Sequence, residues 1–442
     1  MDFLIDYMLD PAGAAVVLFA LFFGLLALGT PISIAIGVSS LLVGMVYLPS
    51  DVIFFIGAQK MFSGIDSFTL LAIPFFVLAG SIMNKGGIAI RLINLAKLLG
   101  GRMPGALAHT NVIANMLFGS ISGSSIAAAA AVGGVMGPLQ AREGYDRRFS
   151  AAVNIASAPT GILIPPSGPL ILFSLVSGGT SISALFMGGY IPGLLMGLSV
   201  MIVITIIAWR RGYRSEGRAG IGEVLHTFWA ALPSLLMVVV VIGGIAIGAF
   251  TATEGAAVAV LYSFLLSLLY RMASWREYLG ALKSSAVTSC SILFLIAASG
   301  IMSYVMTIAG IPDIIADGIL SFDNPIVILL IMNVSLLIIG FFMDLTPAVL
   351  IFTPIFLPIA QEIGVHPVHL GIMMIFNLGV GSMTPPVGSV LFVGCAVAGL
   401  RIDQVIRPIL PFFFATSFAL ALVTYVPWFT LALPRFLGLM QP

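Results

Sequence analysis

Charged side chains are scarce in this sequence. Asp, Glu, Lys and Arg make up only 8% of its 442 residues, whereas 60% of the residues are hydrophobic. An average soluble domain contains about 25% charged residues, and a soluble chain this apolar would expose patches large enough to aggregate. The scarcity of charge therefore excludes an ordinary soluble protein and predicts a polytopic membrane protein.

Cysteine, histidine and enzyme motifs are also sparse. The two cysteines, Cys290 and Cys395, lie in apolar runs, which excludes a disulfide framework and favours buried, inert thiols. The 4 histidines have no metal-ligand spacing, and the sequence contains no P-loop, nucleophile elbow or zinc His-Glu-x-x-His motif. The absence of a Walker motif excludes direct ATP hydrolysis by this chain. Nothing in the sequence resembles an enzyme, and no nucleic-acid partner is expected.

Long apolar runs are what the sequence has instead. Runs at 12–29, 32–48, 194–209, 235–250 and 256–269 each suit one bilayer crossing, which needs about 20 apolar residues in a helix. Ten-residue segments of alternating polarity, the mark of a β-barrel, are absent. The first residues, MDFLIDYMLD, lack the basic region of a cleaved signal peptide. We therefore expect an all-α fold with about ten transmembrane helices.

The sequence repeats itself at an offset of 220 residues. TGILIPPSGPLILF at 160–173 is matched by GSMTPPVGSVLF at 381–392, so that Pro165 and Pro166 align with Pro385 and Pro386. Further glycines and prolines align at the same offset. We predict two structural repeats at 1–210 and 224–442, joined by a polar linker at 211–223.

Loop charges predict that the two repeats have opposite orientations. The segment 85–102 carries Lys and Arg but no acid, whereas its counterpart at 304–324 carries Asp but no base. Because cytoplasmic loops are enriched in Lys and Arg, we expect the first loop inside and the second outside, with both chain termini outside. Inverted-topology repeats are typical of secondary transporters, which bind their substrate where the repeats meet near the bilayer midplane.

The same loop charges predict two re-entrant hairpins, and the two proline pairs predict two broken helices. In the first repeat we expect an inner hairpin at 103–139 and a helix at 149–187 that is broken at its paired prolines. In the second repeat we expect an outer hairpin at 325–360 and a broken helix at 369–400. Non-helical backbone at membrane depth is tolerated only where protein or a watery cavity supplies hydrogen bonds. The symmetric breaks therefore favour a binding site, with a simple proline kink as the alternative.

Small polar side chains gather at these breaks. Ser120, Ser122, Ser124 and Ser125 surround Gly123 in the first hairpin, and Asp344 occupies the position equivalent to Ser124 in the second. The half-helices before the prolines carry further polar residues, namely Asn154, Ser157, Thr160, Asn377, Ser382 and Thr384. Hydroxyl, carbonyl and carboxylate oxygens are the ligands of hard cations, which favours a Na⁺ site.

Each of these residues has a structural alternative. The serines could serve close helix packing, and Asp344 could cap the helix that begins before Pro347. Half-helix N-termini at the breaks would suit an anionic substrate group. Glu254, which follows Thr251 and Thr253, is better explained as a helix cap than as a chemical group.

Four stretches resemble the large membrane subunit of tripartite ATP-independent periplasmic (TRAP) transporters of the C4-dicarboxylate or organic-acid type. They are GSISGSSIA, YDRRFSAAVNIASAPTGILIPPSGPLILFS, MDLTPAVLIFTPIFLPIA and MTPPVGSVLFV. The resemblance covers essentially the whole chain. It implies an elevator-type ion transporter fold and Na⁺-coupled import of an organic acid across the inner (cytoplasmic) membrane of a bacterium or archaeon.

The resemblance also implies partners. A periplasmic substrate-binding protein would deliver the substrate, and a small four-helix membrane subunit would complete the scaffold in the lipid bilayer. Because the chain starts almost directly at its first span, we expect the small subunit to be encoded separately. A stand-alone Na⁺- or H⁺-coupled anion symporter is the alternative. A channel or an intramembrane enzyme is disfavoured, since no short filter, second acid or nucleophile–base pair accompanies Asp344.

The resemblance finally implies a set of site residues. The substrate is expected between the hairpin tips, at Ser122, Gly123, Ser124, Thr160, Pro165, Pro166, Thr346, Pro385 and Pro386. The Na⁺ ligands are expected among Ser120, Ser124, Ser125, Asn154, Gly161, Asp344, Thr346, Asn377, Gly381 and Thr384.

Overall fold

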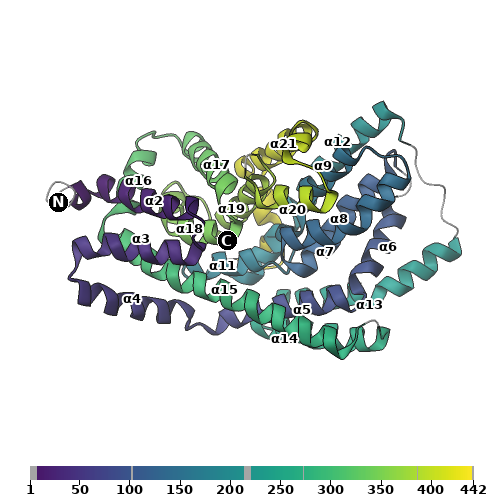
Figure 1. Cartoon of the computed structure of the whole chain (residues 1–442), viewed down its shortest axis with the longest axis horizontal. Helices are drawn as coiled ribbons and strands as arrows, with labels where there is room; N and C mark the ends of the chain where they lie inside the picture. Colours follow the sequence, from purple (N-terminus) through teal and green to yellow (C-terminus); the bar gives the residue numbers. More distant parts are fainter. Residues whose placement is uncertain (1–6, 101–102, 214–220, 272, 386, 441–442) are drawn as a thin grey trace.

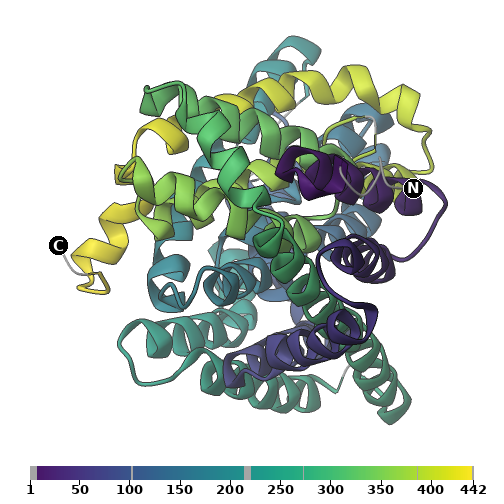
Figure 2. The same ribbon diagram turned by 90° about the vertical axis from the view of Figure 1, so that its left-hand side faces the viewer.

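The computed structural model describes residues 7–100, 103–213, 221–271, 273–385 and 387–440, and within these ranges it is helical without a β-strand. Eight of the described helices are long and apolar enough to cross a membrane, or nine if one bent pair counts as a span. The prediction of an all-α, multi-pass membrane protein is thereby confirmed. Figure 1 shows the helices packed into one elongated body, and in Figure 2 the last helix projects at the left edge, away from the purple N-terminal helices.

The first part of the chain forms three consecutive helices, two of which pack along a much longer one. The predicted spans at 12–29 and 32–48 are α2 (Pro11–Ala27) and α3 (Ile32–Tyr47). A further helix, α4 (Ser50–Ile65), was not predicted, because its Asp51 and Lys60 interrupt the apolar pattern. Helix α15 (Trp275–Ile308) is 34 residues long and contacts both α3 and α4.

A second group of helices extends this outer layer. Helix α14 packs against α5, and α13 packs against both α6 and α14. Thr251 and Glu254 form a reciprocal capping box at the start of α14, which confirms the predicted capping role of Glu254. The helices of this group are α5 (Ala72–Lys85), α6 (Ile88–Gly100), α13 (Ile221–Ala246) and α14 (Ala252–Tyr270). Helix α16 (Ile311–Leu320) lies apart from them and packs against α2 and α18 (Leu345–Glu362).

The remaining helices form the two hairpins and the two broken segments that the sequence predicts. Two helix pairs meet at non-helical tips, namely α7 (Ala106–Ser122) with α8 (Ser125–Arg142), and α17 (Pro325–Phe342) with α18 (Leu345–Glu362). Two other segments are broken, namely α9 (Arg147–Ser157), α10 (Thr160–Leu163) and α11 (Gly168–Val176), and α19 (Pro367–Ser382) with α20 (Ser389–Ala398). They pack against three further helices, which are α12 (Ile182–Arg211), α21 (Ile402–Tyr425) and α22 (Trp428–Phe436).

The first broken segment bends by 49° across its proline pair. Two consecutive prolines cannot donate backbone hydrogen bonds, so the helix cannot continue through them. The segment is shorter than predicted, because it ends at Val176 and α12 begins only at Ile182. Residues 177–181 instead form a turn that contains two glycines with positive φ, Gly178 and Gly179.

The two broken segments run in opposite directions. At one end, the Arg147 guanidinium at the start of α9 donates to the carbonyl of Ala398 at the end of α20, at 3.0 Å. At the other end, Gly371 near the start of α19 lies against the ring of Phe173 in α11. Two repeats of opposite orientation would place the start of each broken segment beside the end of the other. The inversion across a membrane stays a prediction.

One cysteine differs from the expectation of buried thiols. Cys395 is buried, but Cys290 is exposed on α15. Its neighbours one turn away on the same helix, Val287 and Phe294, are also exposed. An apolar run in a membrane helix has an outer face, so apolar neighbours in the sequence do not imply burial in the protein.

The predicted orientation can be tested by labelling two matched positions. Leu99 and Phe322 are 57% and 55% exposed and lie in the loops predicted to be inside and outside. In a background lacking Cys290 and Cys395, we expect an impermeant thiol reagent to label Phe322→Cys but not Leu99→Cys in spheroplasts. Permeabilised cells, in which both positions should react, provide the control. Equal labelling of both positions before permeabilisation would contradict opposite loop orientations.

Candidate functional site

A cavity of about 500 Å³ lies where the two hairpin tips meet, and we call it the central cavity. The first tip lines it with Ser122, Gly123, Ser124 and Ser125, and the second with Asp344, Leu345 and Thr346. The first proline break adds Pro166 and the start of α11. Three segments far apart in the sequence, each marked by a break, therefore form one site.

The first tip is shaped by Gly123, whose φ of 63° lies in the left-handed region. This conformation ends α7 and lets α8 begin two residues later, and it favours glycine because a Cβ would be strained there. The Ser124 hydroxyl accepts a hydrogen bond from the Ala127 N–H at 3.2 Å and so caps α8. Ser120 does not line the cavity. Its hydroxyl donates to the Leu117 carbonyl within α7.

At the second tip, Asp344 occupies the N-cap position of α18, but its side chain forms no capping hydrogen bond. The capping interpretation of this residue is therefore not supported. Its carboxylate instead accepts a hydrogen bond from the Ser389 hydroxyl at 3.1 Å. Neither of the two ion pairs found among the described residues involves Asp344. The cavity thus contains one carboxylate whose charge no protein cation neutralises by direct pairing.

Several predicted site residues do not line the cavity. The Thr160 hydroxyl donates to the Ser157 carbonyl at 2.6 Å, and that of Thr384 donates to the Val380 carbonyl at the same distance. The Asn377 amide donates to both the backbone and the side-chain oxygen of Asn333 at 2.8 Å. Pro165 and Pro385 also do not line the cavity, and Pro386 lies outside the described residues.

Gly161 and Gly381 serve as crossing points between helices. A Cβ at Gly161 would lie 2.2 Å from the Gly119 Cα, and one at Gly381 would lie 2.7 Å from the Gly340 Cα. In both cases a hairpin arm crosses a broken segment backbone to backbone, which only paired glycines permit. The predicted list missed Gly119 and Gly340. They align with each other at almost the offset of the proline pairs, and this signal could have revealed them.

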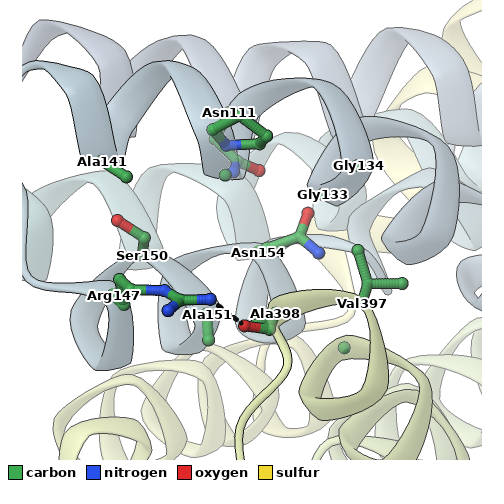
Figure 3. A pocket seen from close by; sticks show the side chains of 13 residues that line it. Asn111, Gly133, Gly134, Ala141, Arg147, Ser150, Ala151, Asn154, Val397 and Ala398 are labelled. Carbon is green, nitrogen blue, oxygen red and sulfur yellow. Dashed lines mark hydrogen bonds between the residues drawn. The ribbon is translucent and has the colours of Figure 1, made fainter.

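Asn154 belongs to a different cavity from the one predicted. It lies in the wall of a cavity of about 380 Å³ between α7, α8, α9 and α20, which we call the inner cavity (Figure 3). Its amide donates to the Ala129 carbonyl at 2.8 Å, and its oxygen accepts from Asn115 at 3.1 Å. The inner and central cavities share no lining residue.

The outer helices complete the central cavity with residues that sequence inspection did not single out. Ser81 and Asn84 of α5 and Thr288 of α15 line it. They lie in continuous helices, and so no helix break marked them. Among the described residues no cluster of three or more His, Cys, Asp or Glu could hold a metal ion. A cation in the central cavity would therefore be held by Asp344 together with neutral oxygens.

A helical membrane fold in which two interrupted hairpins meet at a cavity that carries hydroxyls and one carboxylate is typical of membrane transporters. A family model described as "Tripartite ATP-independent periplasmic transporter, DctM component" matches residues 19–429. The chain belongs to this family, as the large membrane subunit of a TRAP transporter. It is a transport protein rather than an enzyme, and the family implies a location in the inner membrane.

Three relatives align with this chain over more than nine tenths of its length. A protein of Salmonella typhimurium, named uncharacterized protein YgiK, is 53% identical over 95% of this chain and 97% of that protein. The C4-dicarboxylate TRAP transporter large permease protein DctM of Pseudomonas aeruginosa is 41% identical over 92% of this chain and 95% of that protein. The isethionate TRAP transporter permease protein DctMQ of Oleidesulfovibrio alaskensis is 40% identical over 98% of this chain and 67% of that protein.

The fold also has a solved counterpart. The crystal structure of the YdaH transporter of Alcanivorax borkumensis aligns with a TM-score of 0.61 over 86% of this chain and 88% of that one. Because the sequences are only 13% identical, this likeness concerns the fold alone.

Proposed function

We propose that this subunit imports an organic acid, as its carboxylate anion, together with Na⁺. The observation that carries the proposal is that three helices begin at the central cavity. Their first residues, Ser125 of α8, Gly168 of α11 and Leu345 of α18, all line it. Helix N-termini present unpaired N–H groups and the positive end of the helix dipole, which favours a bound anion. A cavity of about 500 Å³ falls within the usual range for small-molecule sites.

The charge of Asp344 supports the proposal of Na⁺ coupling. A carboxylate substrate in the same cavity would be repelled by this carboxylate at short range. A Na⁺ ion held by Asp344 with hydroxyls such as those of Ser124 and Thr346 would remove the repulsion. Binding of cation and anion would then be mutually favourable, which is the thermodynamic basis of symport.

We propose an elevator-type movement in which the two hairpins and broken segments shift against the outer helices. The central cavity supports this, because one side of its wall comes from the hairpin tips and the other from α5 and α15. Binding groups on both sides of such an interface can separate when one body moves, which opens the site to one aqueous side at a time.

The family implies a small membrane subunit and a periplasmic binding protein as partners. We propose that the binding protein delivers an organic acid to the outer side of this subunit. The names of two relatives refer to C4-dicarboxylate and isethionate, a carboxylate and a sulfonate. Both are small organic anions, as the helix N-termini at the central cavity favour. The alternative, a stand-alone symporter, would need no binding protein.

The test is uptake into proteoliposomes that contain this subunit and its small partner. With the binding protein outside, we expect uptake of radiolabelled substrate in a Na⁺ gradient to fall to background when external Na⁺ is replaced by choline at fixed membrane potential. Omitting the binding protein should have the same effect. Undiminished uptake in choline would exclude Na⁺ coupling, whereas full uptake without the binding protein would favour the stand-alone symporter.

A further inference from the structure

The inner cavity is lined by one positively charged side chain and by no acidic one. Of the residues that line it, Arg147 is the only one with a charged side chain. Figure 3 shows this side chain reaching from the first turn of α9 toward Ala398 in α20. The hydrogen bond to the Ala398 carbonyl uses one of the five donor positions of the guanidinium. Most of its donors therefore remain available to a ligand.

The acid next to Arg147 in the sequence does not neutralise it. The Asp146 carboxylate accepts a hydrogen bond from the Arg148 N–H at 2.8 Å and forms an ion pair with Arg211 at 3.1 Å. Arg147 is not part of either ion pair seen among the described residues, and its one hydrogen-bond partner, Ala398, is a neutral carbonyl. The cavity wall thus keeps a net positive charge.

Two buried polar groups on the same wall lack partners. The Nδ2 atom of Asn111 and the Oγ atom of Ser150 form no hydrogen bond, although the residues are only 0% and 6% exposed. The oxygen of Asn111 accepts from the Asn115 amide at 2.9 Å, which leaves its nitrogen as the free group. Both free groups can donate, as can the guanidinium. A buried polar group without a partner is costly, and a wall of donors is suited to an anion.

One face of α8 connects this wall to the central cavity. Ala127 and Ala130 line the central cavity, and Gly134, Gly137 and Ala141 line the inner cavity. Their spacing of three and four residues places all five on one side of the helix. A Cβ at Gly134 or Gly137 would meet nothing within 4 Å. The face that joins the two cavities is therefore made of small residues and is open beside the inner cavity.

We propose that the inner cavity is a second anion site, which binds a carboxylate through Arg147, Ser150 and Asn111 after it leaves the central cavity. This inference rests on the proposed import of an organic acid. The loop at 141–148, which carries Arg147, is basic and predicted to be inside. A site at this end would receive the anion on the cytoplasmic side and would bind it without Na⁺, because its charge comes from arginine.

The test measures the electrostatic potential in the cavity and does not depend on transport. Gly134→Cys places a thiol where there is free space, in a background lacking Cys290 and Cys395. The full subunit in its membrane complex is labelled without Na⁺ by anionic sulfonatoethyl or cationic trimethylammonioethyl methanethiosulfonate. We expect the ratio of anionic to cationic labelling rates to fall about three- to tenfold in Arg147→Gln. It should be kept in Arg147→Lys and in the adjacent control Arg148→Gln.

Succinate serves as the probe carboxylate in the second arm. At millimolar concentration and without Na⁺, it should slow anionic labelling of Gly134→Cys, and Arg147→Gln should lose this protection. An equal rate ratio in Arg147→Gln and the parent, or equal protection by succinate in both, would overturn the proposal. Thermal unfolding of each variant checks that the loss of the bond to Ala398 has not unfolded α20. Because Na⁺ is absent throughout, failure of Na⁺-coupled uptake leaves these outcomes unchanged.

Discussion

Gly161→Ala should abolish uptake and markedly destabilise the protein, although it adds only one methyl group. The added Cβ would lie 2.2 Å from the Gly119 Cα and 2.6 Å from its carbonyl carbon. Both are backbone atoms of a helix that cannot move aside locally. Overpacking of a core typically costs about 1–3 kcal/mol, and a clash with backbone belongs at or above the upper end. Thermal unfolding of the purified subunit and uptake by the reconstituted complex measure the two effects.

A matched control lies on α8, the other arm of the hairpin that contains Gly119. Gly134 is also in the interior of a helix, but a Cβ there would meet nothing within 4 Å. Gly134→Ala should therefore be neutral or stabilising, by up to about 1 kcal/mol from helix propensity. If Gly161→Ala unfolded at the same temperature as Gly134→Ala, the close crossing of α7 and α10 would be wrong.

At the second helix crossing, between Gly340 and Gly381, the two glycines should differ in how far an added methyl group lowers stability. A Cβ at Gly381 would lie 2.7 Å from the Gly340 Cα, whereas one at Gly340 would lie 3.1 Å from the Gly381 Cα. We expect Gly381→Ala to lower the unfolding temperature more than Gly340→Ala. The opposite order would indicate that the two helices cross in a different register.

Asp344→Asn should raise the Na⁺ concentration required for half-maximal uptake by at least about tenfold. A unit charge about 4 Å from a cation is worth roughly 4 kcal/mol at an effective dielectric constant of about 20, and about 1.4 kcal/mol corresponds to a factor of ten in affinity. The amide keeps an oxygen and its size but loses the charge. Because Asp344 forms no capping hydrogen bond, the change should have little effect on thermal stability.

Ser389→Ala is the control for this experiment. It removes the hydroxyl that donates to Asp344 but leaves the charge, so its Na⁺ dependence should shift much less. A Na⁺ curve for Asp344→Asn that matched the parent, with stability unchanged, would leave any cation to hydroxyls and carbonyls such as those of Thr346. The proposal that Asp344 couples the cation to the substrate would then be withdrawn.

The sequence by itself determined the class of protein and the segments that form its site. A bilayer tolerates few charges and requires helices whose backbone is internally bonded, so composition alone indicates a helical membrane protein. Interruptions of such helices depend on local residues, namely Gly123 with its positive φ and the proline pair that precedes α11. Because both effects act over a few neighbouring residues, the hairpin tip and the first broken helix could be located without a structure.

Only the tertiary structure decided which side chains in those segments face the central cavity. Ser122 and Asp344 line it, but Ser120 bonds within its own helix and Thr160 to the end of α9. Asn154 belongs to the inner cavity. The contributions of α5 and α15, the extra helix α4 and the exposure of Cys290 were likewise not foreseen. The orientation of a side chain on a helix depends on which distant helix packs against each face. That choice is made by contacts between residues far apart in the sequence, and local patterns do not contain it.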